Sequence, residues 1–162
     1  MTPEQFCEEH GIKLEATAVP ENPNMSGEMS PGSMHFHCVL RSSESGRTFT
    51  TYYSVGSGIV DSWLRAKYPR TKNAPYDFAL VRQRRAHQYK PPVSDVLNCL
   101  QLDANMQENS RCFHEWCDEL GYDSDSIRAR KIYDHCEEQA RKLWEFLGYR
   151  TYRELIDEVQ ED

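Results

Sequence analysis

The stretch MHFHCVLRSSESGRTFTTYYSV, residues 34–55, decides the fold of this chain because it contains two strand-like segments around one turn. Residues 34–41 and 47–55 are rich in aromatic, β-branched and other apolar residues, which favour strands. Between them, the loop Ser43–Gly46 ends on a glycine that can adopt a positive φ. These features predict a β-hairpin.

The register of this hairpin follows from the alternation of side chains along a strand. If Ser42 pairs with Arg47, one face of the hairpin becomes mainly apolar and the other mainly polar. His35 and His37 would then share the polar face. The apolar face would consist of Phe36, Cys38, Leu40, Phe49, Thr51 and Tyr53.

The residues before the hairpin predict a helix and a third strand. Thr2 and Gln5 form a capping box with Pro3 at the first helical position, and Gly11 suits the helix end. Residues 12–19 then alternate between apolar and polar side chains, which is typical of a half-buried strand. With the hairpin, this segment predicts a three-stranded antiparallel sheet.

The residues after the hairpin are predicted to be largely helical. We expect a short helix over residues 59–68, a short strand or helix over 78–82, and four helices from Ser94 onward. Of these four, the first is short and carries Val96, Leu97 and Leu100; the others cover about 110–120, about 125–147, and a last segment capped by Thr151 and Glu154.

These elements predict the α+β class: a three-stranded antiparallel sheet with a short N-terminal helix and a helical C-terminal half packed on the sheet. We divide the chain by composition into residues 1–58, 59–92 and 93–162. We expect one domain overall, since 162 residues suffice for one core.

Charge is distributed unevenly along the chain. Residues 65–90, here called the basic segment, carry eight basic residues and one acid, Asp77, which gives a net charge of +7. Residues 1–64 carry −5 and residues 91–162 carry −9, within a total of −7. Such polarity predicts two surfaces that attract partners of opposite charge.

Composition favours a soluble globular protein of the cytoplasm. The mean hydropathy is −0.79 while 11% of residues are aromatic, so there is material for a core. No apolar run has the length of a membrane span, and the first residues do not resemble a signal peptide. In a reducing compartment we expect the six cysteines to be free thiols or metal ligands.

Four places carry residue types that are used in metal binding or catalysis, but none forms a complete motif. Cys112, His114 and Cys117 cannot bind one ion from a regular helix, and no paired Cys-x-x-Cys motif is present. His135 and Cys136 leave the question open. We therefore expect no cofactor. The other three places are the pair His35 and His37, the glycine turn Gly56-Ser57-Gly58, and Asp123-Ser124-Asp125-Ser126, which better suits a helix cap.

The basic segment is the strongest candidate for a binding site. Its cations alternate with aromatic residues, as in surfaces where bases stack and phosphates pair with basic side chains. Docking on the protein's own acidic half or on a second copy is an equal alternative, so we expect a monomer or a homodimer. The candidate residues are Arg82, Arg84, Arg85, Lys67, Arg70, Lys72, Tyr68 and Tyr89.

A second candidate is an acidic face on the C-terminal helices that could mimic nucleic-acid phosphates, although such a face is often only solvated. The acidic tail, which includes Glu161 and Asp162, would add to it. The acidic face consists of Glu115, Asp118, Glu119, Asp134, Glu137 and Glu138.

Several short motifs occur in a characteristic order over residues 1–58 and 91–155, with the basic segment as an insertion between them. They are His10-Gly11-Ile12, Asn22-Pro23-Asn24-Met25, Tyr53-Ser54-Val55-Gly56-Ser57-Gly58, Pro92-Val93-Ser94-Asp95-Val96-Leu97, Gly121-Tyr122-Asp123-Ser124-Asp125-Ser126 and Phe146-Leu147-Gly148.

In these motifs the chain resembles a family of small, largely uncharacterised proteins encoded by bacteriophages and prophages. The resemblance implies phage origin and an accessory or counter-defence role in the host cytoplasm, and it brings no catalytic residues. We therefore expect a non-enzymatic inhibitor of a bacterial defence complex, foremost a CRISPR effector, that occludes a nucleic-acid-binding surface. The alternatives are a nucleic-acid-binding accessory protein and a small enzyme that uses His35, His37 or Ser57.

Overall fold

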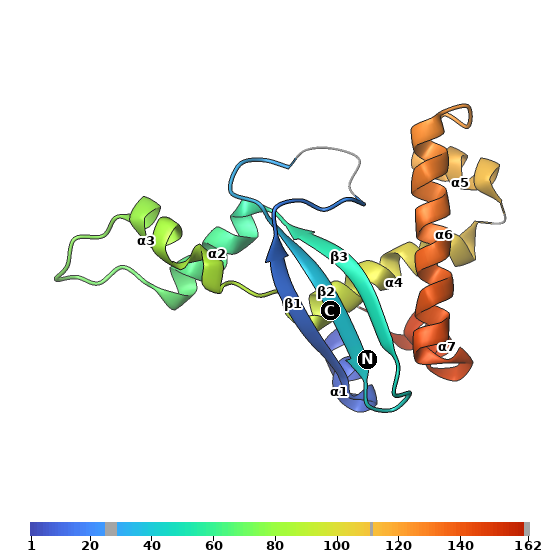
Figure 1. The fold of residues 1–162 in the computed structure, drawn as a ribbon, viewed down its shortest axis with the longest axis horizontal. Helices are drawn as coiled ribbons and strands as arrows, with labels where there is room; N and C mark the ends of the chain where they lie inside the picture. Colours follow the sequence, from blue (N-terminus) through green and yellow to red (C-terminus); the bar gives the residue numbers. More distant parts are fainter. Residues whose placement is uncertain (25–28, 111, 161–162) are drawn as a thin grey trace. The chain divides into compact units, whose positions relative to one another are not determined.

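The computed structural model describes residues 1–24, 29–110 and 112–160 (Figure 1). Within these ranges, no helix combines the length and the apolar character needed to cross a membrane. The fold is α+β, as predicted. Its elements are α1 (Pro3–His10), β1 (Ile12–Val19), β2 (Met34–Ser42), β3 (Thr48–Val55), α2 (Ser57–Lys67), α3 (Phe78–Arg85), the 3₁₀ turn η1 (Ala86–Gln88), α4 (Val93–Asn109), α5 (Phe113–Leu120), α6 (Ile127–Leu147) and α7 (Tyr149–Glu158).

The three strands form one antiparallel sheet in which β2 lies between β1 and β3 (Figure 1). The predicted hairpin register is confirmed, since the Ser42 amide donates to the Arg47 carbonyl over 3.2 Å. The opposing His37 and Tyr52 rings, 5.2 Å apart, obey the same register. The face predicted to be apolar is the buried one, and Phe36 on it is fully buried.

By spatial contacts the described chain divides into two compact units that cut across the segments drawn from composition. Unit 1 contains residues 1–15, 39–50 and 92–162, and unit 2 contains residues 16–38 and 51–91. Each strand therefore contributes residues to both units.

Unit 1 is built around α4, which packs against α1, α6 and α7. Leu97 of α4 is fully buried, and Leu143 of α6 is 1% exposed. At the sheet, the Phe49 ring of β3 lies 5.9 Å from the Phe146 ring of α6. A smaller cluster joins α5 to α6 and contains Trp116, Cys117 and Ala129, with Phe113, Ile132 and Tyr133 packed against it.

Unit 2 has a core formed by its own strand residues and by α2. Val60 and Leu64 are the buried residues of α2. Tyr89 is 4% exposed, and its ring lies 6.0 Å from Phe36 and 5.5 Å from Trp63. α3 has no buried residue.

Two of the predicted helices differ from the observed ones. α4 runs from Val93 to Asn109 and is longer than predicted. Its apolar periodicity is weak, but packing on α1, α6 and α7 stabilises the helix over its whole length. The capping box predicted for Thr151 and Glu154 is wrong. α7 starts at Tyr149, directly after Gly148 with φ of 82°, so both residues lie inside the helix.

Candidate functional site

The basic segment forms the last residues of α2, the loop 68–77, α3 and η1 (Figure 1). Proline disfavours helix at the residue before it, which is consistent with the loop between the two helices. Asp77 caps α3 by accepting from the Leu80 amide over 3.4 Å. The loop is closed by the Tyr76 hydroxyl, which donates to the Tyr68 carbonyl over 2.9 Å.

Cations lie over the aromatic rings of this segment. The guanidinium carbon of Arg65 is 3.7 Å from the centre of the Phe78 ring, and that of Arg70 is 5.4 Å from the Tyr76 ring. Arg85 lies 5.4 Å from the Tyr68 ring. A guanidinium stacked on a ring is held in place by the ring face while its N–H edge stays available to an acceptor.

Arg82 is engaged differently from the other cations. Its Nε and Nη2 donate to the two carboxylate oxygens of Asp61 over 2.9 and 2.6 Å. The hydrogen bond and charge of Asp61 raise the pKa of Arg82. Arg84 and Lys72 are exposed and make no hydrogen bond, ion pair or ring contact with another described residue. Arg84 is thus more available than Arg82 to an external anion.

The aromatic residues predicted to contact a partner lie at different depths. Tyr68 is half-buried, and its hydroxyl donates to the side-chain carbonyl of Gln88. Lys67 lies over the Trp63 ring at 4.8 Å and is exposed. Tyr89 is a core residue of unit 2 whose ring packs against Phe36 and Trp63, so it offers no exposed surface on which a base could stack.

The acidic face is partly neutralised within its own helices. On α6, Asp134 pairs with Arg130 at 3.2 Å, and Glu138 pairs with Lys142 at 3.2 Å. On α5, Asp118 lies 3.8 Å from His114. The surface consequently alternates in charge. Other acidic residues also have partners. Glu137 accepts a hydrogen bond from Tyr133, Glu119 accepts one from Ser110, and Glu115 also interacts with another residue. In the acidic tail, Asp157 pairs with Arg153, and Glu161 and Asp162 lie outside the described residues.

The cysteine and histidine residues of α5 and α6 have separate environments. Cys112 is exposed, whereas Cys117 and Cys136 are buried. Burial raises the pKa of Cys136 to about 12, so its thiol is protonated at neutral pH. Burial also lowers the pKa of His135. In the described part of the chain, the group of three potential ligand side chains whose ligand atoms lie close together does not include any of these cysteines or histidines.

The histidines of the hairpin contact residues on the neighbouring strand. His35 Nδ1 lies 2.7 Å from Ser54 Oγ, which also accepts from Asn22 Nδ2 over 3.0 Å. His35 is thus paired with Ser54 of β3, whereas Ser57 is the first residue of α2. The role predicted for Asp123–Ser126 is confirmed, since Ser126 caps α6 by accepting from the Ala129 amide.

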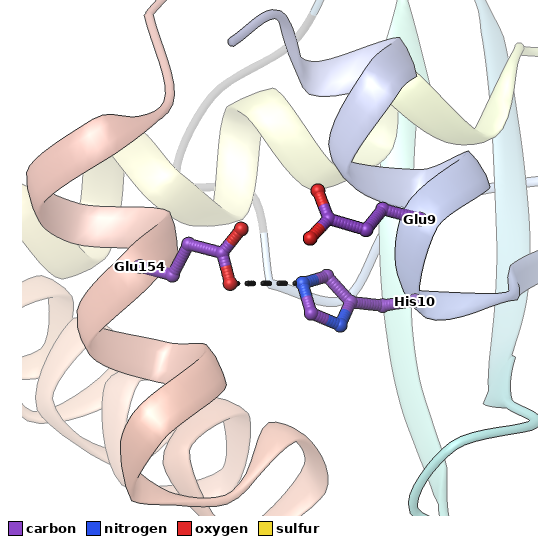
Figure 2. Close-up of side chains that lie close together, drawn as sticks. All are labelled: Glu9, His10 and Glu154. Carbon is purple, nitrogen blue, oxygen red and sulfur yellow. Dashed lines mark hydrogen bonds and ion pairs between the residues drawn. The ribbon is translucent and has the colours of Figure 1, made fainter.

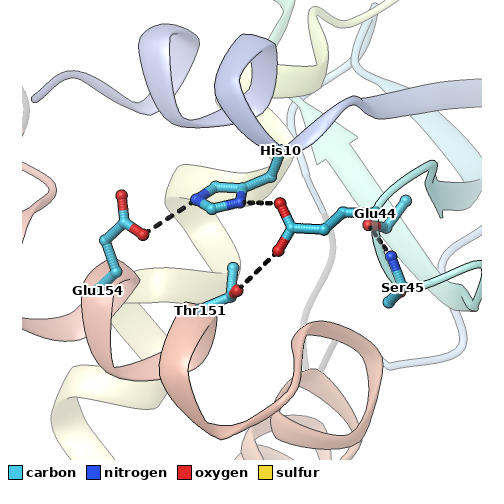
Figure 3. Close-up of polar contacts among 6 residues, drawn as sticks. His10, Glu44, Ser45, Thr151 and Glu154 are labelled. Atoms are coloured by element: carbon cyan, nitrogen blue, oxygen red, sulfur yellow. Dashed lines mark hydrogen bonds and ion pairs between the residues drawn. The ribbon is translucent and has the colours of Figure 1, made fainter.

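A further cluster lies in unit 1 and surrounds His10, the last residue of α1. His10 is 8% exposed. Its Nδ1 lies 2.6 Å from Glu44 of the hairpin loop, and its Nε2 lies 3.0 Å from Glu154 of α7. Thr151 donates to the other oxygen of Glu44 over 3.2 Å (Figure 3). The hairpin loop and α7, both far from α1 in sequence, thus each place a carboxylate on the imidazole of His10.

The charges of this cluster shift its pKa values in opposite directions. Burial lowers the pKa of His10, but the hydrogen bonds and charges of Glu44 and Glu154 outweigh burial and leave it raised. The hydrogen bond from His10 lowers the pKa of Glu44, and the charge of His10 and the Thr151 hydroxyl act in the same direction. The imidazole is therefore stabilised as a cation between two carboxylates.

A third carboxylate approaches the same ring. Figure 2 shows the side chains of Glu9, from α1, and Glu154, from α7, turned toward His10. In the described chain, Glu9, His10 and Glu154 offer one ligand atom each within 4.8 Å of one another. Glu9 is exposed and has no other described contact. This cluster was not predicted from the sequence, because Glu44 and Glu154 are distant from His10 in the chain and nothing in the local pattern connects them.

Comparisons of this chain with models of protein families, with curated proteins and with solved structures find no match.

Proposed function

We propose that this chain is a non-enzymatic binding protein that contacts the phosphate backbone of a nucleic acid through its basic segment. The observation that carries the proposal is the arrangement of arginines on the aromatic rings of α2, α3 and the loop between them. The stacked guanidinium groups of Arg65, Arg70 and Arg85 keep N–H edges available to phosphate oxygens.

This arrangement favours backbone contacts over base stacking. The ring of Phe78 has Arg65 at 3.7 Å and Arg82 at 5.1 Å, so the cations already cover an aromatic surface that a base would need. Contacts with phosphates carry no direct sequence information. We therefore expect binding that depends strongly on salt and weakly on sequence.

The experiment measures the affinity for a fluorescent single-stranded oligonucleotide and a duplex over a series of salt concentrations. Arg84→Glu with Arg85→Glu should weaken binding strongly. Arg84→Ala should reduce the magnitude of the slope of log K against log salt by about 1 if Arg84 contacts one phosphate. Arg82→Ala should change the slope less than Arg84→Ala, because Arg82 is already paired with Asp61.

Arg150→Glu is the matched control, because Arg150 is exposed on α7, outside the basic segment, and has no described contact. This variant changes the net charge like a single reversal in the segment but should retain affinity. The proposal fails if the protein binds neither oligonucleotide at low salt, or if the Arg84 and Arg85 reversals bind like the unchanged protein.

The inhibitor of a bacterial defence complex stays a second candidate, supported by the resemblance to phage-encoded proteins and by the exposure of Asp118 and Glu119 on α5. A basic nucleic-acid-binding surface of such a complex would be attracted to the acidic face and repelled by the basic segment. The ion pairs within α6 reduce the net charge of that face, which is why the nucleic-acid binder ranks first.

Affinity capture of the tagged protein from bacterial lysate, with and without nuclease, distinguishes the two candidates. Recovery of nucleic acid that disappears after nuclease treatment supports the binder. A nuclease-resistant, stoichiometric protein complex that is lost on reversal of Asp118 and Glu119, and kept on reversal of Arg84 and Arg85, supports the inhibitor.

A further inference from the structure

We propose that Glu9, His10 and Glu154 form a binding site for a divalent transition-metal ion, with Zn²⁺ as the ion that best suits the ligand set. One imidazole nitrogen and two carboxylates are ordinary zinc ligands, and three protein ligands leave one position for water. The site lies in unit 1 and rests on residues outside the basic segment, so it is independent of nucleic-acid binding.

The position of Glu44 is the second observation that points to a metal. Histidines that bind metals commonly donate their other ring N–H to a carboxylate, which fixes the tautomer and orients the ring. Glu44 occupies this position at 2.6 Å from Nδ1, and Thr151 in turn holds Glu44. Nε2 is consequently the nitrogen that faces Glu154 and the space beside Glu9 (Figure 2).

The distances suit a shared ion after a small movement of one side chain. His10 Nε2 and Glu154 are 3.0 Å apart, which is compatible with two ligands bound to one ion at about 2.0–2.2 Å. The remaining distances, up to 4.8 Å, involve Glu9. Its exposed side chain is free to rotate toward the ion because no other described residue holds it.

Charge balance also favours a cation here. Glu9, Glu44 and Glu154 surround a single imidazole, and the ion pairs described for Glu44 and Glu154 are both with His10. When a metal binds, Nε2 gives up its proton to the solvent and donates its lone pair to the ion. The ion then brings two positive charges to the three carboxylates, in place of the single positive charge of the protonated imidazole.

Glu9 makes the proposal testable without disturbing the fold. Glu9→Gln removes a ligand but none of the hydrogen bonds of His10, so the metal-free variant should be as stable as the unchanged protein. Glu8→Gln is the matched control, because Glu8 is the neighbouring exposed acid of α1 and lies outside the cluster. Glu44→Gln probes the orienting carboxylate and should weaken affinity about 10- to 100-fold.

The experiment treats the protein with a chelator and then titrates Zn²⁺ calorimetrically, at neutral pH. We expect one ion per chain, at least a tenfold loss of affinity in Glu9→Gln and less than a twofold change in Glu8→Gln. Co²⁺ should give a visible spectrum without a thiolate charge-transfer band, which separates this site from the free cysteines. Absence of binding, equal affinity in Glu9→Gln, or a thiolate band would overturn the proposal.

Discussion

Gln101 is the residue whose replacement tests the packing of unit 1 most directly. It lies in α4 and is 4% exposed. Its Nε2 donates to the carbonyl of Leu155 over 2.9 Å and to that of Val159 over 2.6 Å. These carbonyls belong to the C-terminal end of α7, where the helix itself provides no donors. Gln101 of α4 thus supplies hydrogen-bond donors to two carbonyl groups at the end of α7.

Gln101→Met keeps the length of the side chain and removes both hydrogen bonds. Each bond contributes about 0.5–1.5 kcal/mol net, so we expect the free energy of unfolding to fall by about 1–3 kcal/mol. Gln101→Glu should cost more at neutral pH, because a buried carboxylate would face two carbonyl oxygens and lose hydration without gaining a partner.

The assay is urea unfolding followed by tryptophan fluorescence, with Gln107→Met as the control. Gln107 lies on the same helix, and its Nε2 is buried without a described hydrogen-bond partner, so its replacement should cost little or stabilise. Equal stability of Gln101→Met and Gln107→Met, or a Gln101→Glu variant as stable as the unchanged protein, would contradict this role of Gln101.

Two further predictions concern the residues around His10. In chelator-treated protein, the destabilisation caused by Glu44→Gln should be largest between pH 4.5 and 6.5, the ordinary pKa values of Glu and His. The pKa of Glu44 is lowered, so its contribution is lost as pH falls through the folded value; that of His10 is raised, so its contribution is lost as pH rises through the folded value. A cost that rises steadily up to pH 9 in denaturant titrations would contradict this sign. Gly11→Ala should destabilise the protein by about 1–2 kcal/mol or more, because Gly11 has φ of +60° and an added Cβ would lie 1.8 Å from Ser43 Oγ; unchanged urea unfolding would show that the loop moves freely.

Local signals predicted much of the fold. The capping box at Thr2 and Gln5 and the helix end at Gly11 are observed because the short-range hydrogen bonds that define them need no distant partner. The hairpin register was also predictable, since shifting it by one residue would expose Phe36, Leu40 and their neighbours to water.

Tertiary contacts determined what the sequence pattern missed. Thr151 and Glu154 have the spacing of a capping box, and that spacing does place them on one side of α7. Their partners, however, are Glu44 and His10 from distant parts of the chain. A helix was thus correctly predicted here, while its first residue and the hydrogen-bond partners of Thr151 and Glu154 depended on packing that no local rule describes.

In the basic segment, too, local sequence patterns did not predict the tertiary contacts. Its charge was evident from the sequence, but the ion pair of Arg82 with Asp61 and the burial of Tyr89 were not. Both depend on how α2 packs against α3 and on how Tyr89 packs against Phe36 and Trp63 within unit 2. Composition identified the segment, and the structure distinguished its supporting residues from its available cations.

The division of every strand between the two units has a practical consequence for genetics and engineering. A fragment that begins at Pro92 would keep α4 to α7 but lose α1 and Phe49, which pack against α4 and Phe146. Deleting residues 51–91 would interrupt β3 between its two ends. Truncations and deletions should therefore report mainly loss of folding, and the two proposed sites are better tested by point substitutions.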